Sequence, residues 1–344
     1  MNSFQAKPEI FTTKSPALSL LQCLMLSLPV LCYGATGDDL DQCLLKAIKS
    51  AAANSTIEQI RQKCQQELKK KITKPGAISQ RILSERQTAF DPYVITPHKM
   101  NYILPVSISD EINKQAYTAI GGWAENFEDT EAKLQLSIKV PLNYASLFTP
   151  GDGIYFGFTL QSWWQVYSDN ISKPFRETNY QPEFFYLTPL NWHPVDSNTG
   201  LALGIEHQSN GRSQLLSRSW NRLYVNFLFE KNNFGLSFKP WWRIEEDDKA
   251  FELDPEGDDN PDIEDFMGYF EVKAAYKWQQ YELSFTGREN FAEHHGGLEL
   301  GLTFPLWGKL RGYLQYTSGY GESLIDYNHK QQRFGLGIAL TNLL

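Results

Sequence analysis

The sequence has few positive charges and no long apolar run. Beyond its first segment, none of its 344 residues lies in an uninterrupted stretch of about eighteen or more apolar residues, which excludes a protein that crosses a membrane with helices. The 40 acidic residues outnumber the 32 basic ones, and a net charge of −8 gives no reason to expect binding to nucleic acid. Aromatic residues nevertheless make up 14% of the chain. This combination is typical of a soluble β protein or of a β-barrel in an outer membrane.

The first 34 residues have the parts of a secretory signal peptide. Two lysines precede an apolar run over residues 17–33, and small residues then lead to a cut after Gly34. A retained membrane anchor is the alternative, but Gln22 and Pro29 interrupt the run. We therefore predict that residues 1–34 are removed on export.

Cysteine is scarce, and only Cys43 and Cys64 remain after that cut. Residues 38–74 carry apolar side chains at helical spacing on both sides of a break near Ser55, which predicts a small helical hairpin. Both cysteines lie on the apolar faces and are nearly equidistant from the break. In an exported chain this predicts one disulfide bridge, with two unpaired core cysteines as the alternative.

From about Lys99 onward the apolar residues recur with a period of two, which predicts strands near the length of a tilted membrane-spanning strand. Twelve are predicted, over residues 99–108, 132–142, 153–166, 182–189, 200–208, 219–229, 234–243, 266–276, 280–288, 296–305, 309–317 and 333–344. Long polar and short connections alternate between the later strands, as in outer-membrane barrels. We predict an all-β fold: a twelve-stranded antiparallel transmembrane β-barrel over residues 94–344. A periplasmic helical hairpin and a linker (residues 75–93) would precede it, over residues 35–93.

The last predicted strand has two distinct faces. Large apolar residues (Phe334, Leu336, Ile338 and Leu340) alternate with small ones (Gly335, Gly337 and Ala339). Periodicity alone does not tell inside from outside, and a soluble lipocalin-like barrel would place the large residues inside. The export signal and the strand number favour an outer-membrane barrel whose large residues face lipid.

One predicted hairpin, formed by strands 200–208 and 219–229, has a well-specified register. If Leu201 faces Phe227, one face is entirely apolar, and the other is small and polar and includes the pair Glu206 and Arg222. A shift by one residue would mix the two faces. The sequence therefore predicts this register and no other.

In that register the apolar face ends with His207 opposite Asn221, and Ser209 follows on the same side. Directly opposed residues have Cβ atoms about 4.5–5.5 Å apart, so Asn221 can hold the imidazole while Ser209 meets its other nitrogen. An asparagine orients the histidine without adding a charge beside hydrocarbon, where a carboxylate is costly. A Ser-His-Asn hydrolase site is one interpretation. The alternative is a histidine and a serine that touch lipid headgroups at a barrel rim.

The segments 207–213 and 217–224 resemble the active-site hairpin of the outer membrane phospholipase A family. Other segments that resemble this family are residues 162–165, 174–180, 258–263 and 318–328. The resemblance covers roughly residues 92–344 and is densest after residue 160. Long strings in the same order are much more specific than a bare motif. The resemblance implies a twelve-stranded barrel, in agreement with the strand count.

The resemblance also implies a calcium-dependent phospholipase that is activated by dimerisation. Ser209 would be the nucleophile, His207 the general base and Asn221 the orienting residue, while the Gly211 amide would donate to the oxyanion. In the family, oxygen atoms at the dimer interface hold the calcium, as this ion prefers. The matching ligands are the Arg212 carbonyl, the Ser217 hydroxyl and the carbonyl of the partner subunit's Ser172.

Three positions depart from the family pattern. Leu160 occupies the place of a glutamine at the dimer face, and the neighbouring Gln161 would point the other way. Gln214 replaces an acidic residue that could serve a second calcium site, and the chain ends on Leu344 instead of phenylalanine.

Acidic residues also crowd positions 247–265, which predicts a solvated loop, with weak calcium binding as the alternative. The rival to a phospholipase is a catalytically silent barrel that acts as a pore or a structural protein.

Overall fold

The computed structural model describes residues 45–49, 56–57, 59–60, 75–88, 94–118, 120–251, 253–308 and 310–344. The chain divides into two units, Met1–Ile72 and Thr73–Leu344. In the first unit, residues 45–49 are helical, as are residues 57, 59 and 60, and the rest of the predicted hairpin 38–74 lies outside the described residues. The predicted signal peptide and both cysteines of the predicted disulfide, Cys43 and Cys64, lie outside the described residues.

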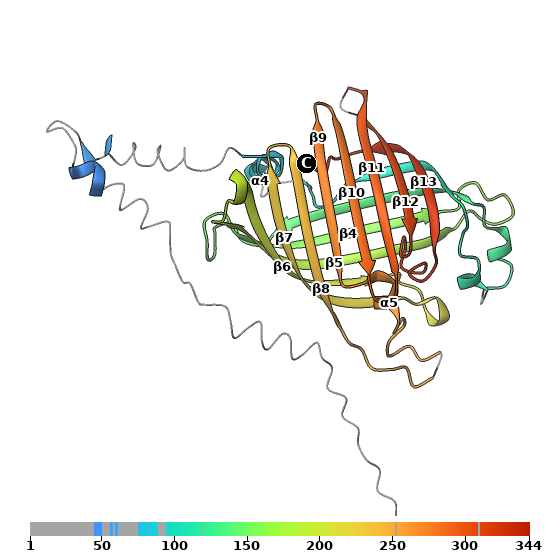
Figure 1. Cartoon of the computed structure of the whole chain (residues 1–344). Helices are drawn as coiled ribbons and strands as arrows, with labels where there is room; N and C mark the ends of the chain where they lie inside the picture. Colours follow the sequence, from blue (N-terminus) through green and yellow to red (C-terminus); the bar gives the residue numbers. More distant parts are fainter. Residues whose placement is uncertain are drawn as a thin grey trace, which may run out of the picture. The chain divides into compact units, whose positions relative to one another are not determined.

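The second unit is a closed antiparallel barrel of twelve strands, β2 to β13 (Figure 1). Each strand pairs with the next along the chain, and β13 pairs with β2, which closes the sheet. The strands are β2 Tyr102–Ser109, β3 Thr130–Pro141, β4 Gly153–Trp164, β5 Phe175–Leu190, β6 Asn198–Ser209, β7 Ser219–Lys231, β8 Phe234–Ile244, β9 Phe270–Trp278, β10 Tyr281–Asn290, β11 His295–Trp307, β12 Leu310–Gly319 and β13 Gln331–Ala339. A two-residue strand, β1 (Thr96–Pro97), pairs with β3. The predicted twelve-stranded fold is confirmed.

Helices are few in the described part of the barrel unit. Two α-helices are present, α4 Ala77–Thr88 and α5 Ile263–Met267, with short 3-10 turns at Gln115–Tyr117, Ala124–Asn126, Pro194–Asp196 and Gln214–Leu216. Across the described residues, no helix is both long and apolar enough to cross a membrane.

The structure corrects several predicted boundaries, among them the start of β5 at Phe175, seven residues before the predicted strand 182–189. Helix α4 occupies most of the predicted linker 75–93, and α5 occupies the start of the strand predicted over 266–276. The last strand ends at Ala339 and not at residue 344. Helix α4 escaped detection because its stability depends on distant partners. The Glu230 carboxylate accepts from the amides of Gly76 (3.1 Å) and Ser79 (2.8 Å), and Arg81 donates to the Leu343 carbonyl at 2.7 Å.

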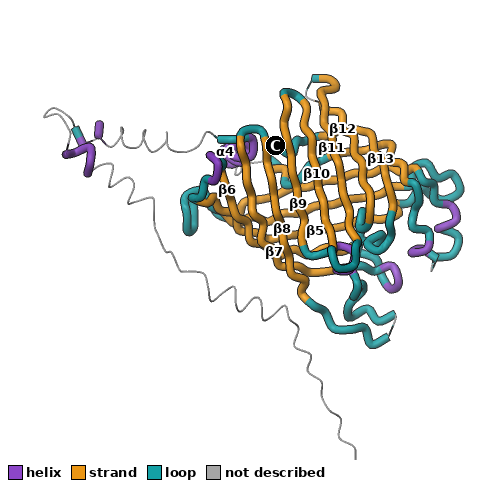
Figure 2. Tube along the Cα trace, viewed as in Figure 1, coloured by secondary structure: helices purple, strands orange, loops and turns teal. Residues whose placement is uncertain are grey.

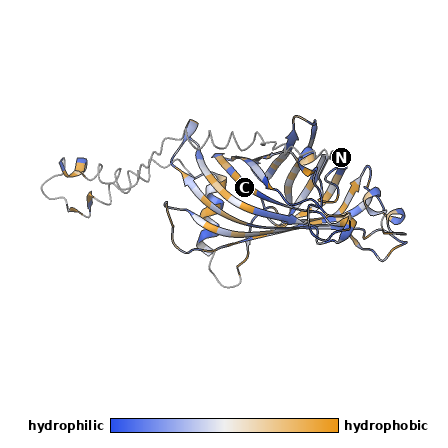
Figure 3. Ribbon diagram, turned by 90° about the horizontal axis from the view of Figure 1, so that it is seen from below, coloured by the Kyte–Doolittle hydropathy of each residue, from blue (hydrophilic) through white to orange (hydrophobic). Residues whose placement is uncertain are grey.

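The barrel is apolar outside and polar inside. Leu203, Phe227 and Leu336 on the outer surface are 43%, 49% and 47% exposed, whereas the side chains of Arg176 and Glu131 are completely buried inside the barrel. Hydrophobic and hydrophilic residues alternate along the strands in Figure 3. A soluble barrel has the opposite arrangement, so the lipocalin-like alternative is wrong and the large apolar residues face lipid.

The connections differ between the two ends of the barrel (Figure 2). The end at which β6 runs into β7 carries long connections, including residues 210–218, 245–269 and 320–330. At the opposite end, tight turns join β7 to β8 and β9 to β10, and the last strand finishes there. We call the first the outer end, because outer-membrane barrels carry their longer loops outside and their short turns in the periplasm.

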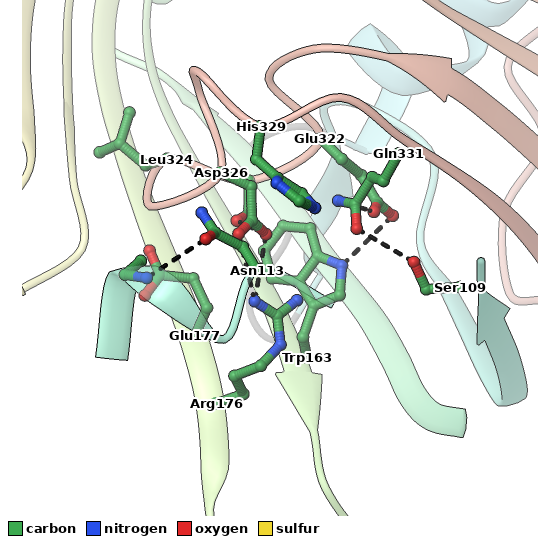
Figure 4. Close-up of polar contacts among 12 residues, drawn as sticks. Ser109, Asn113, Trp163, Arg176, Glu177, Glu322, Leu324, Asp326, His329 and Gln331 are labelled. Carbon is green, nitrogen blue, oxygen red and sulfur yellow. Dashed lines mark hydrogen bonds and ion pairs between the residues drawn. The ribbon is translucent and has the colours of Figure 1, made fainter. Parts of the chain in front are cut away.

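A network of ion pairs fills the lumen near the outer end. Arg176 donates to Glu131 at 2.8 Å and to Asp326 at 3.1 Å, and Figure 4 shows the second of these contacts. Arg333 contacts Glu131 at 2.9 Å and Glu322 at 2.8 Å. Asp326 and Glu322 belong to the connection 320–330. Because a buried charge is costly without a partner, these pairs hold that connection inside the barrel.

Candidate active site

The hairpin of β6 and β7 has the predicted register. Leu201 pairs with Phe227, and His207 pairs with Asn221. Glu206 and Arg222 form an ion pair on the lumen side, where both are buried. The opposite-charge pair therefore faces inward, and the apolar face together with His207 faces outward.

His207 and Asn221 form the core of the site. The imidazole Nδ1 lies 2.9 Å from the Asn221 Oδ1, and both side chains are half-buried. An amide oxygen can only accept, so the histidine donates from Nδ1 and keeps its lone pair on Nε2. This tautomer is the one that a general base acting through Nε2 requires.

Ser209 lies beside this pair on the same face. It is the last residue of β6, two positions after His207, and it pairs with Ser219 of β7 and Tyr180 of β5. Within the described part of the chain, no hydrogen bond joins Ser209 to His207, a contact that often tightens only when substrate binds. The structure thus gathers the three predicted catalytic residues at one rim and directly connects two of them.

The loop after Ser209 is held by Asn210, which is 3% exposed. Its amide nitrogen donates to the Leu216 carbonyl at 2.8 Å, and its oxygen accepts from the amides of Arg212 (3.2 Å) and Arg218 (3.0 Å). Sequence reasoning missed Asn210. Its only sequence signal is an asparagine ahead of a glycine, which is typical of any turn.

Gly211 has a backbone conformation that favours glycine. Its φ angle is +63°, and a Cβ atom there would lie 3.3 Å from the Tyr180 ring. The glycine follows Ser209 by two residues, within the loop that Asn210 ties together. The predicted oxyanion donor therefore belongs to a constrained segment next to the predicted nucleophile.

Oxygen atoms gather on the far side of the same loop. The Ser217 hydroxyl donates to the Asp259 carboxylate at 2.6 Å, and Lys249 contacts the other oxygen of that carboxylate at 2.6 Å. Arg212 belongs to the same loop as Ser217, and Ser172 is an exposed residue of the connection between β4 and β5. In the described part of the chain, no group of three or more His, Cys, Asp or Glu side chains could hold a metal. The oxygens that the structure brings together here are the Ser217 hydroxyl and the Asp259 carboxylate, and the sequence alone did not single out Asp259.

The fold and the site define a membrane-spanning β-barrel that carries hydrolase-type residues on its lipid-facing surface. A family model described as phospholipase A1 matches residues 78–340, which includes most of α4. The chain is 38% identical to the phospholipase A1 of Escherichia coli K12 over 78% of its own length and 88% of that protein.

Solved structures of outer membrane phospholipases also match the chain. One is the outer membrane phospholipase A of E. coli as an Asn-to-Ala active-site mutant, with 37% identity and a TM-score of 0.70 over 76% of this chain and 98% of that one. Another is the calcium-bound outer membrane phospholipase dimer of Salmonella typhi, with 36% identity and a TM-score of 0.69 over the same shares. The chain belongs to the phospholipase A1 family. It is an integral β-barrel of the outer membrane and an ester hydrolase that acts on phospholipids.

Proposed function

We propose that the chain cleaves acyl ester bonds of membrane phospholipids with Ser209 as nucleophile, His207 as general base and Asn221 as orienting residue. The observation that carries the proposal is the 2.9 Å contact between His207 Nδ1 and Asn221 Oδ1, beside Ser209 on the lipid-facing surface. An asparagine is also an active-site residue of the E. coli relative. The three side chains supply the nucleophile, base and orienting group of a triad.

The reaction follows from these roles. His207 Nε2 accepts the proton of the Ser209 hydroxyl as its oxygen attacks the ester carbonyl carbon. The carbonyl oxygen gains negative charge within reach of the Gly211 amide, and the imidazolium then protonates the departing alcohol of the lysophospholipid. A water molecule then attacks the ester formed between Ser209 and the acyl chain, and His207 accepts its proton. The imidazolium returns that proton to the Ser209 oxygen, and the fatty acid is released.

We propose calcium as the cofactor. The proposed donors are oxygens only, the Arg212 carbonyl and the Ser217 hydroxyl, and the Ser217 hydroxyl contacts the Asp259 carboxylate, which adds a further oxygen; this chemistry suits calcium. When bound, the ion would polarise the ester carbonyl next to the Gly211 amide. The ligand set would be completed by the carbonyl of the partner subunit's Ser172.

A homodimer is therefore part of the proposal, as in the calcium-bound dimer of the Salmonella relative. Gln161 donates to Gln135 in the lumen at 2.7 Å, so it is turned away from the outer surface. The outer surface then presents Leu160 at this point, and the subunits would associate through apolar contacts. A monomer would offer half of the lipid groove, so phospholipid that reaches the outer leaflet would bring activity and association together.

The rival is a silent barrel that conducts ions or serves as a structural protein. The buried ion pairs around Arg176 and Asp326 hold the connection 320–330 in the outer part of the lumen and disfavour a wide pore. One experiment separates the two classes: fatty-acid release from mixed micelles with calcium, measured beside conductance in a planar bilayer. We expect calcium-dependent release and no stable channel. Channels without release would favour the rival.

For the chain before the barrel we propose a cleaved signal peptide over residues 1–34 and a periplasmic hairpin fastened by a bridge between Cys43 and Cys64. Closing a loop of about twenty residues would stabilise two short helices by roughly 3 kcal/mol. A non-reducing peptide map of the exported protein tests this. Free thiols at both positions would contradict the bridge.

A further inference from the structure

Asn221 has a second partner, which lies beyond the predicted triad. Its amide nitrogen donates to the Glu246 carboxylate at 2.9 Å, while its oxygen accepts from His207. In the sheet, Asn221 pairs with Ile244, the last residue of β8. Glu246 follows Ile244 by two residues, so the outward face of β8 continues to Glu246 past the end of the strand. His207, Asn221 and Glu246 form a row across three neighbouring segments.

The two ends of an asparagine amide have nearly the same shape but opposite hydrogen-bonding roles. With its oxygen toward His207 the amide accepts from Nδ1–H, and Nε2 is free to act as base. With its nitrogen toward His207 it would instead favour the tautomer protonated on Nε2, which cannot take a proton from Ser209. Asn221 can therefore orient the histidine only if something orients Asn221.

We propose that Glu246 is a positioning residue that sets the direction of the Asn221 amide and, through it, the catalytic tautomer of His207. An ionised carboxylate only accepts hydrogen bonds, so it admits the amide nitrogen and excludes the oxygen. Glu246 is half-buried at the rim, so part of its carboxylate stays in contact with solvent. The Glu246 carboxylate thus acts on the imidazole of His207 only through the side chain of Asn221.

This inference rests on the proposed function, and its test starts from Glu246→Gln. A glutamine keeps the size and removes the acceptor-only character, so both amide directions become available to Asn221. The matched control is Glu245→Gln, which removes the same charge from the exposed neighbouring residue. We expect kcat to fall about tenfold for Glu246→Gln, with KM and the calcium concentration for half-activation unchanged. The control should stay within about twofold of wild type. A change of calcium dependence would reassign Glu246 to cation binding and overturn the proposal.

A reversal of sign gives the sharper readout. In an Asn221→Asp background, two carboxylates face each other, and Glu246→Gln supplies an amide that can donate to the new aspartate. The same Glu246→Gln change should therefore lower kcat when residue 221 is asparagine and raise kcat when it is aspartate. A purely structural contribution of Glu246 would have one sign in both backgrounds, and that result would contradict the proposal.

Two measurements keep the outcomes separate. Folding of each variant is checked by the heat-dependent gel mobility of the barrel. If Ser209→Ala keeps its activity, the proposed function itself fails. If Ser209→Ala is inactive while Glu246→Gln behaves like Glu245→Gln, the triad stands and only the role of Glu246 fails.

Discussion

The two faces of strands β6 and β7 carry polar residues for different purposes. On the outer face, His207 and Asn221 are 14 positions apart in the sequence and stand at the end of an apolar surface. On the inner face, Glu206 pairs with Arg222 and Lys239, and further around the lumen Arg176 meets Asp326 across 150 positions. The outer set is small and local, and the inner set is large and joins distant parts of the chain.

The residues that stabilise the fold and the residues proposed for catalysis therefore lie on opposite faces of the same sheet. The lumen holds buried ion pairs such as Arg176 with Asp326 and Arg333 with Glu322, and these bind the connection 320–330 into the barrel. The outer face of β6 and β7 carries the residues proposed for catalysis, His207, Ser209 and Asn221, next to the lipid that would supply the substrate. Changes on the outer face should therefore alter activity but not folding, and changes in the lumen should do the opposite.

The largest effect is expected for Ser209→Ala. Removal of the nucleophile should lower fatty-acid release by more than about a thousandfold. Ser209 lies at the rim, so the variant should keep the heat-dependent gel mobility of the folded barrel. Near-normal activity in a folded variant would show that Ser209 is not the nucleophile.

Removal of calcium comes next. If the ligands are divided between two subunits, chelation weakens association by mass action and also removes the oxyanion support. Crosslinked dimer and activity should fall together as chelator is added, and both should return with calcium. A fully active monomer without calcium would show that the site on the outer face needs neither the ion nor the partner subunit.

A smaller loss is expected for Asn221→Ala. In the proposed triad Asn221 orients His207 and takes no part in proton transfer, so activity should fall on the order of ten- to a hundredfold. Single-turnover rates of this variant and of Ser209→Ala give the comparison. Equal losses in the two variants would mean that Asn221 does more than orient the base.

The smallest effect on activity is expected from the lumen. Burial alone would raise the pKa of Glu322, but the positive charges of Arg333 and Lys133 lower it to about 2. A lowered pKa gives stability that is present above the ordinary value of about 4.5 and is lost as the pH falls toward 2. Glu322→Gln should therefore lower the unfolding temperature at pH 7 and leave the activity of the folded enzyme nearly unchanged. The gap in unfolding temperature should narrow between pH 4.5 and pH 2, and a constant gap would contradict this explanation.

The sequence predicted the features that depend on residues close together in the chain. The strands and the pairing of His207 with Asn221 were accessible because an alternating pattern specifies a register within one hairpin. Helix α4 was missed because Glu230 and Leu343, which hold it, are far away in the sequence. Asn210 and Glu246 were missed, and Asp259 was predicted only as one of many acidic residues in 247–265, because loops carry no periodicity that places their side chains.

The central claim is that Ser209 is an activated nucleophile on the lipid-facing surface. The most direct measurement is to treat the detergent-solubilised protein with a sulfonyl or phosphonate reagent, with and without calcium, and to identify the modified residue by peptide mapping. The account predicts one modified residue, Ser209, labelled quickly with calcium and slowly without it, together with loss of activity. Inactivation through another residue, or full activity after Ser209 is labelled, would contradict it.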